Sequence, residues 1–125
     1  MSPGQAVGET FSRDDRLRKR REFEECYASG VRVSGRHLQL FLLPRPGAEG
    51  IRLGISVGKR AGGAVLRNRL RRRLREVFRR NRPAAPTALD LVVNLRPSAA
   101  SASFPELAND YLLTIERGLA RLRSR

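Results

Sequence analysis

The chain has 125 residues, of which 40% are hydrophobic, and a formal net charge of +14 from 26 basic and 12 acidic residues. This length allows one domain with a hydrophobic core, and the charge indicates a polyanionic partner, with nucleic acid ahead of an anionic membrane. The only cysteine, Cys26, excludes an intrachain disulfide and fits a reducing cytoplasm. No apolar run reaches the length of a membrane span, and residues 1–20 lack the apolar core of a signal peptide. We therefore expect a cytoplasmic protein that binds nucleic acid.

The first residues predict an arm without regular structure, because they contain Gly, Pro and Ser and show no hydrophobic period. We expect a disordered arm over residues 1–12, a single domain over residues 13–123 and a short tail over residues 124–125.

A short helix is predicted over Arg20–Ser29, and Gly30 is its stop signal. Phe23 and Tyr27 are four residues apart, so both rings lie on one face of this helix. Taken alone, two such rings are more often core residues than ligand contacts. The helix by itself therefore does not decide their role.

Alternating apolar residues predict a strand over residues 31–43 and a second strand over Ile51–Val57. One face of the second strand is aliphatic, and so is one face of the first. The residues on these faces are Leu38, Leu40, Leu42, Ile51, Leu53, Ile55 and Val57.

The opposite face of the same strands is small and polar, apart from one aromatic ring. Phe41 lies there together with Gln39, Arg52, Gly54 and Ser56. If the strands pair, Phe41 is exposed on a wet, basic surface, as in proteins that stack single-stranded bases on aromatic rings.

Residues 58–80 are densely basic and predict a helix with one apolar and one cationic face. The apolar stripe comprises Leu66, Leu70, Leu74, Val77 and Phe78. The opposite face comprises Asn68, Arg72, Arg75 and Arg79, with Arg69 and Arg73 beside it. Like charges three or four positions apart destabilise a helix by a few tenths of a kcal/mol per pair, and only Glu76 offsets them. A polyanion would relieve the repulsion, since guanidinium groups suit phosphate oxygens.

The remaining chain predicts a central strand and a closing helix. The nearly continuous apolar run Leu89–Leu95 is typical of a central strand, and an amphipathic helix is expected from Phe104 to about Leu122. The order helix, strands, helix, strand, helix predicts an α+β protein, a two-layer α/β sandwich with one sheet. The unit of strand, basic helix and strand is a crossover, for which the general rule favours a right-handed connection.

Catalytic signatures are missing from the sequence. Residues 59–63 lie between a strand and a helix but lack the residue order of a phosphate-binding loop. His37, the only histidine, has no nucleophilic neighbour, and the acidic residues show neither an acid–base pair nor a metal cluster. We therefore expect an RNA-binding protein with no catalytic residue and no metal site of its own.

The basic segment resembles the RNR signature of the bacterial ribonuclease P protein family. The similar residues there are 56–60, 62, 64–65, 67–69, 72–76 and 78–79. Similarity to the family's N-terminal pattern and late strand is carried by Arg16, Leu17, Phe23, Gly30, Val33, Ser34, residues 91–93 and Arg96. The resemblance spans roughly residues 16–122, and it departs from the family at Gly63, where Asn is usual.

This resemblance implies a function and refines the fold. Ribonuclease P removes the 5′ leader of precursor tRNA by hydrolysis, its RNA subunit holds the catalytic Mg²⁺, and its protein binds that RNA and the leader. The implied fold has one mixed sheet of about four strands, three helices and a left-handed crossover at the RNR helix, against the general rule.

The family pattern also implies two groups of contact residues, and it implies neither a catalytic residue nor a metal ligand in the protein. Contacts to the RNA subunit are implied for Lys59, Arg60, Arg67, Asn68, Arg69, Arg72, Arg73, Arg75 and Arg79. Contacts to the leader are implied for Phe23, Tyr27, Phe41, Gln39, Arg52 and Ser56. The expected partners are ribonuclease P RNA and precursor tRNA, with no membrane and no DNA.

Two other functions remain open from the residues. One is a general ribosome-associated or structured-RNA-binding protein with no role in cleavage. The other, a DNA-binding module, needs a helix-turn-helix partner before the basic helix, whereas Gly62 and Gly63 follow a strand.

Overall fold

The computed structural model describes residues 16–83, 85 and 88–125, so the arm predicted over residues 1–12 lies outside the described residues. The described chain forms helices, strands and two short 3-10 turns, η2 and η3. In chain order these elements are α2 (Arg20–Ser29), β1 (Val31–Ser34), β2 (Leu38–Pro44), β3 (Ile51–Val57), η2 (Lys59–Ala61), α3 (Ala64–Arg80), β4 (Leu89–Leu95), η3 (Pro97–Ser101) and α4 (Phe104–Arg123). None of the described helices is both long and apolar enough to span a bilayer.

The four strands form one mixed sheet in the order β1-β2-β4-β3. β2 is antiparallel to β1 and to β4, whereas β3 and β4 are parallel. The predicted central position of β4 is confirmed, and its apolar run reflects burial on both faces of the sheet.

The single strand predicted over residues 31–43 is wrong, because β1 and β2 are two strands of a hairpin. The break has a tertiary cause. The Asp110 carboxylate on α4 accepts hydrogen bonds from the backbone N–H groups of Arg36 (2.9 Å) and His37 (2.7 Å), so it satisfies the turn between the strands. Gly35 contributes as well, since a Cβ there would collide with Thr114 and Asp110.

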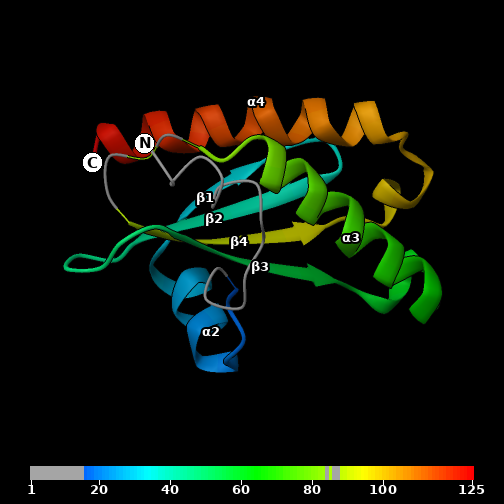
Figure 1. Ribbon diagram of the computed structural model, residues 1–125, viewed down its shortest axis with the longest axis horizontal. Coiled ribbons are helices and arrows are strands. Elements are labelled where there is room, and N and C mark those ends of the chain that lie inside the picture. The colour runs from blue at the N-terminus through cyan, green and yellow to red at the C-terminus, as the bar shows by residue number, and fades with distance from the viewer. Residues whose placement is uncertain (1–15, 84, 86–87) are drawn as a thin grey trace.

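The crossover from β3 through α3 to β4 is left-handed, as the family resemblance implies. In Figure 1, α3 lies in front of the sheet, the arrows of β3 and β4 both point to the right, and β4 lies above β3. The general right-handed rule therefore does not hold at this connection.

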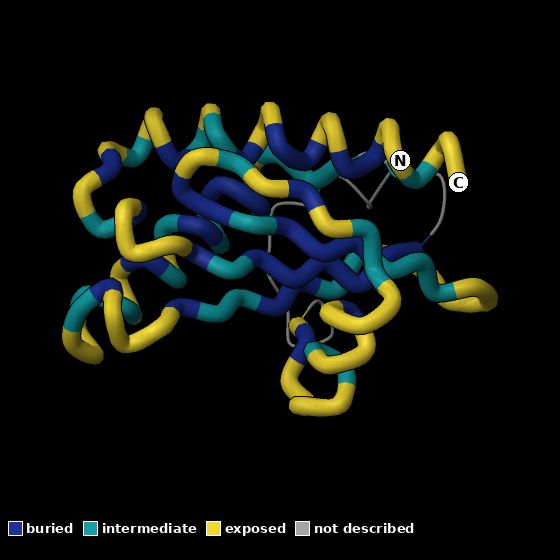
Figure 2. The backbone as a smooth tube through the Cα atoms, turned by 180° about the vertical axis from the view of Figure 1, so that it is seen from behind, coloured by how far each residue is buried: buried dark blue, intermediate teal, exposed yellow. Residues whose placement is uncertain are grey.

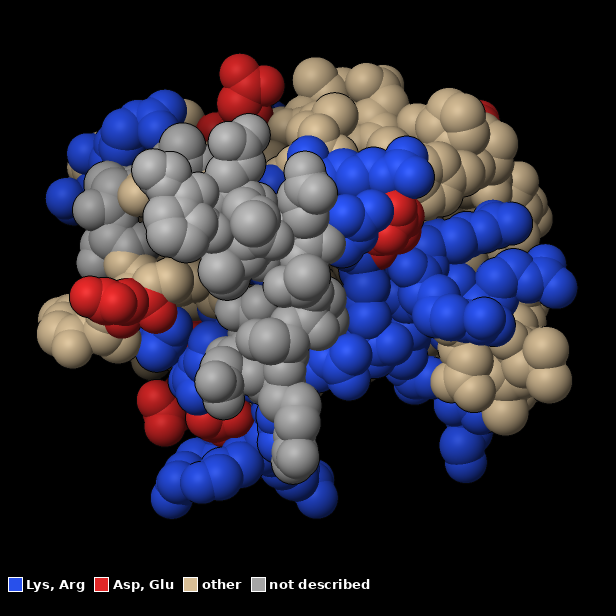
Figure 3. Space-filling view, viewed as in Figure 1, with Lys and Arg blue, Asp and Glu red and all other residues tan. Residues whose placement is uncertain are grey.

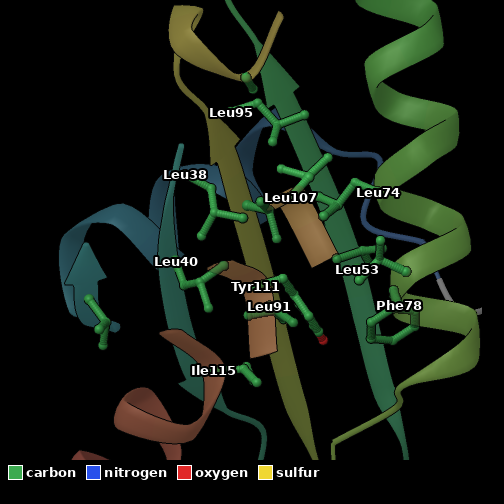
Figure 4. Packing of buried hydrophobic residues seen from close by; sticks show 14 of the residues in the cluster. Leu38, Leu40, Leu53, Leu74, Phe78, Leu91, Leu95, Leu107, Tyr111 and Ile115 are labelled. Carbon is green, nitrogen blue, oxygen red and sulfur yellow. The ribbon is translucent and has the colours of Figure 1, made fainter. Parts of the chain in front are cut away.

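The main core lies between one face of the sheet and the pair α3 and α4. Figure 4 shows leucines of β2, β3 and β4 directed toward Leu74 and Phe78 of α3 and toward Leu107, Tyr111 and Ile115 of α4. Each of the two helices buries one stripe and exposes the other, which Figure 2 shows most plainly for α4. A capping box starts α4, in which Ser103 Oγ accepts from the Glu106 N–H (3.1 Å) and Glu106 Oε1 accepts from the Ser103 N–H (2.8 Å).

Among the described helices, α2 alone lies on the other face of the sheet, where it packs on β2 and β4. A second, smaller core forms under this helix from Leu17, Cys26, Phe41 and Val92. α2 is short, and among the described residues Gln39, Ser56 and Asn94 beside it are half-buried. This part of the face, called the open part of the sheet below, positions the candidate site.

Candidate nucleic-acid interface

The first candidate surface consists of η2 and the solvent-facing side of α3. Figure 3 shows Lys and Arg side chains gathered over α3, on the right of the view. Lys59 and Arg60 of η2 are exposed, as are Asn68, Arg69 and Arg72 of α3. Arg67, Arg73, Arg75 and Arg79 are half-buried. Arg67 and Arg73 border the apolar stripe, whereas Arg75 lines a groove and Arg79 is paired with Glu76. The predicted cationic face therefore exists, and Arg69 and Arg72 are exposed on it.

Glu76 neutralises the C-terminal end of this surface. Its carboxylate oxygens accept from Arg79 Nε (3.0 Å) and Nη2 (2.7 Å) and from Arg80 Nε (2.7 Å). The hydrogen bonds from Arg79 are the main reason that the pKa of Glu76 falls to about 2. Arg79 is thus held by an intramolecular ion pair, and an incoming phosphate would have to compete with Glu76 for it.

Arg75 lies in a different setting from Arg72, although both were predicted on one helix face. With Arg16 and Arg71 it lines a groove of about 100 Å³ between α3 and the outer edge of β3. Burial is the main cause that lowers the pKa of Arg75, and the positive charges of Arg16 and Arg71 lower it further. Arg71 was not among the contact residues predicted from the sequence. A helical wheel gives the direction of a side chain around the helix axis, but it does not show which strand that side chain approaches.

The second candidate surface is the open part of the sheet beside α2, and here the predicted exposure of Phe41 is wrong. Phe41 is only 7% exposed, because α2 packs over it and places it in the small core with Cys26 and Val92. Tyr27 is the exposed ring, at 40%. Its centroid lies 4.8 Å from that of Phe41, with the ring planes at 78°. Phe41 thus supports the ring that can stack on a base, and Tyr27 presents it.

Phe23 is half-buried and joins the two surfaces. Its ring lies over Gly54 of β3, where a Cβ would come within 2.6 Å of Phe23 Cζ. Gly54 is therefore required for this close approach of α2 to the sheet. The same ring lines the groove that contains Arg71 and Arg75.

Arg52 lies on the predicted face, but carboxylates engage it. Its Nε and Nη2 donate to the two oxygens of Asp90 at 2.8 Å each, and its Nη1 donates to Glu22 at 2.8 Å. The hydrogen bonds to Asp90 are the main cause that raises the pKa of Arg52 above its ordinary value. Asp90 is also paired with Arg45 at 2.7 Å. Two arginines and two carboxylates thus form a neutral network, and Arg52 mainly stabilises the fold.

A row of neutral polar side chains crosses the open part of the sheet. Asn94 of β4 is the register partner of Gln39 on β2 and of Ser56 on β3, and all three are half-buried. The Tyr27 hydroxyl donates a hydrogen bond to Asn94 Oδ1 at 2.9 Å. Gln39 and Ser56 were predicted at this site, whereas Asn94 was missed. Its signal is a polar residue within the otherwise apolar segment Leu91–Leu95 of β4.

Cys26 and His37 lie in structural positions, and the described acidic residues are dispersed. His, Cys, Asp and Glu side chains form no cluster of three or more among the described residues. Burial raises the pKa of the Cys26 thiol to about 12, so it is not a nucleophile at neutral pH. The His37 ring nitrogen Nδ1 lies 2.9 Å from Ser98 Oγ, in a structural contact.

A mixed sheet with a cationic helix on one face and an exposed aromatic ring among polar side chains on the other is typical of an RNA-binding protein of the α+β class. The family model described as Ribonuclease P matches residues 11–118. The chain therefore belongs to the ribonuclease P protein family, which makes it a subunit of ribonuclease P, acting with that enzyme's RNA in tRNA processing.

Individual relatives agree with this assignment. The ribonuclease P protein component of Acidothermus cellulolyticus is 40% identical over 111 residues, which cover 86% of this chain and 87% of the relative. That of Shouchella clausii is 37% identical over 97 residues, covering 78% and 80%. The structure of the Thermotoga maritima RNase P protein is 31% identical, with a TM-score of 0.73, covering 82% of this chain and 96% of that one. The Staphylococcus aureus RNase P protein structure has a TM-score of 0.75 at 29% identity, covering 82% and 93%.

Proposed function

We propose that this protein binds ribonuclease P RNA through η2 and α3 and holds the 5′ leader of precursor tRNA in the groove beside α2. The holoenzyme then removes the leader by hydrolysis in the cytoplasm. One observation carries the proposal: the groove lined by Arg71 and Arg75 of α3 is also lined by Phe23 of α2, the helix that carries Tyr27. An RNA helix on α3 and a single strand in the groove can therefore be bound at the same time.

The two surfaces suit different forms of RNA. Exposed arginines such as Arg69 and Arg72 contact phosphates irrespective of sequence. The Tyr27 ring offers a stacking partner for an unpaired base, which a leader supplies and a duplex does not. Two surfaces that suit a structured RNA and a single strand favour a subunit that binds both the enzyme's RNA and its substrate.

The Mg²⁺ ions of the reaction belong to the RNA subunit in this proposal. When bound, such ions activate the attacking water and stabilise charge on the phosphate. Two observations on the described residues support this placement: their His, Cys, Asp and Glu side chains form no cluster of three or more, and Arg52 engages the carboxylates of Glu22 and Asp90. The protein contributes by binding and orienting RNA.

Reconstitution tests the proposal. Leader cleavage is followed at low Mg²⁺ with the protein alone, with a bacterial ribonuclease P RNA alone, and with both. We expect no cleavage by the protein alone and faster cleavage by the mixture than by the RNA alone. Cleavage by RNA-free protein would contradict the assignment of catalysis to the RNA. Binding without stimulation would instead indicate a general structured-RNA-binding protein.

A further inference from the structure

Three arginines of α4 lie along the outer edge of the sheet at β1. In the strand order β1-β2-β4-β3, β1 is an edge strand, and α4 packs on β1 and β2. Arg117 Nη2 donates to the Ser34 carbonyl at 2.9 Å, and Arg121 Nη1 donates to the Arg32 carbonyl at 2.6 Å. Arg125 Nη2 donates at 3.0 Å to the carbonyl of the last residue of α2. Arg117, Arg121 and Arg125 are called the edge arginines below.

The positive charge of the edge arginines is not neutralised within the described part of the chain. All three are exposed, and no ion pair there joins them to a carboxylate. Asp110, two turns before Arg117 on α4, accepts instead from the backbone N–H groups of the turn after β1. Glu116 lies about 100° from Arg117 around the helix axis. The bonds to the backbone use one N–H of each guanidinium group, which carries five donors, so further donors are available to an anion.

The arrangement of the edge arginines favours a phosphate backbone over bases. They are four residues apart, so each step along α4 rises about 6 Å, and the carbonyl bonds hold each guanidinium group in place before a ligand arrives. Like charges at this spacing destabilise a helix, and a line of phosphates would relieve the repulsion. No stacking ring accompanies them: the exposed ring of Tyr27 is bonded to Asn94 on β4, two strands away from the β1 edge. Guanidinium groups without a ring contact phosphates irrespective of sequence.

The edge arginines and the cationic face of α3 lie at opposite edges of the sheet. α3 packs on β3, whereas α4 packs on β1 and β2, and Figure 1 shows α4 running along the β1 side. β1 and β3 are three strand spacings apart, which is roughly 14 Å. Figure 3 shows basic side chains not only over α3 but also at the left of the view, where α4 ends. Two cationic surfaces placed in this way suit two different segments of RNA.

From this geometry we infer that the edge arginines bind the phosphate backbone of a second segment of ribonuclease P RNA, across the sheet from the segment bound by η2 and α3. The inference rests on the proposed binding of that RNA by α3 and adds a second site to it. Once α3 is bound, the second contact is intramolecular, so even a weak contact adds to the overall affinity. The protein thereby bridges two parts of the RNA subunit and restrains them relative to each other.

The first test measures Kd of the full chain for ribonuclease P RNA at several salt concentrations. Arg117→Gln combined with Arg121→Gln should reduce the slope of log K against log salt concentration by roughly 1.4–1.8, the value of two phosphate contacts. The corresponding double Lys variant keeps both charges and an N–H donor, so it should restore the wild-type slope. Arg123→Gln is the matched control, because Arg123 is exposed on α4 about 200° from Arg121 around the helix axis. Thermal melting of each variant establishes that folded protein is compared.

The second test leaves every arginine in place. Ser124→Cys introduces a thiol at an exposed position beside Arg125, and the natural Cys26 is buried, so a photoactivatable cross-linker is attached selectively to the new thiol. In the reconstituted holoenzyme this variant should cross-link to ribonuclease P RNA. Asn109→Cys is the control, because Asn109 is exposed near the other end of α4 and should give no cross-link.

The outcomes separate this inference from the proposed function. If the wild type does not bind ribonuclease P RNA, the proposed function itself fails. If Arg72→Ala reduces the salt slope but the double Gln variant does not, and Ser124→Cys gives no cross-link, the second site alone is overturned. A lower Tm of the double Gln variant with an unchanged slope would show that the edge arginines only shield the backbone of β1. Weaker binding of precursor tRNA with unchanged binding of ribonuclease P RNA would overturn the assignment to the RNA subunit.

Discussion

Two aromatic residues that touch each other should respond to truncation in opposite ways. Phe41 is 7% exposed and lies in the small core, whereas Tyr27 is 40% exposed above it. Truncating a buried Phe to Ala costs about 3–5 kcal/mol, a large part of the 5–15 kcal/mol that typically stabilises a domain. For a chain of this size, Phe41→Ala should lower the Tm by roughly 10–20 °C.

Tyr27→Ala should affect binding instead. Its loss of stability should be smaller than that of Phe41→Ala, because the ring is 40% exposed; the pair contact contributes about 0.5–1.5 kcal/mol and the hydrogen bond to Asn94 a similar amount, about 0.5–1.5 kcal/mol. Removal of a stacking ring costs about 1–3 kcal/mol per base, so the affinity for leader-bearing precursor tRNA should fall roughly fivefold to 150-fold. Affinity for mature tRNA should not change, because it has no leader to stack.

Thermal melting of each variant, combined with titration of the reconstituted holoenzyme, separates these effects. The binding of folded Phe41→Ala should stay near the wild-type value well below its Tm. The reasoning is refuted if Phe41→Ala melts like the wild type and selectively loses leader affinity, since Phe41 would then be the platform. It is equally refuted if Tyr27→Ala binds both tRNA forms as the wild type does.

Two further predictions concern the arginine-rich helix. Arg72→Ala should weaken binding to ribonuclease P RNA and reduce the slope of log K against log salt concentration by roughly 0.7–0.9, the value of one phosphate contact. Arg123→Ala is the control, because Arg123 is exposed on α4. An unchanged slope for Arg72→Ala would show that Arg72 does not contact the RNA. The pKa of Glu76 is lowered from 4.5 to about 2 by Arg79, so its charge stabilises the folded state above about pH 4.5, and this contribution is lost as the pH falls toward 2. Thermal melting of Glu76→Gln between pH 5 and pH 2 should therefore depend less steeply on pH than that of the wild type, and parallel curves would show that the ion pair is not maintained in solution.

Local sequence pattern determined the elements and the direction of their faces. Backbone geometry makes side chains return to the same face every 3.6 residues in α3 and every two residues in β3. The spacing of apolar residues therefore assigned one apolar face and one polar or cationic face to each element. The RNR segment likewise carried the family resemblance through contiguous residues. These predictions are confirmed, because each depends on neighbours within one or two turns of the chain.

Only the tertiary structure decided which of these faces is covered. Alternation placed Phe41 opposite the aliphatic face of β2, but it could not show that α2 packs over that ring and leaves Tyr27 outside. The pairing of Arg52 with Glu22 and Asp90 joins residues 30 and 38 positions apart. The bond from Tyr27 to Asn94 spans 67 positions. Such contacts depend on how a helix docks on a sheet, and no periodicity within either element encodes that placement.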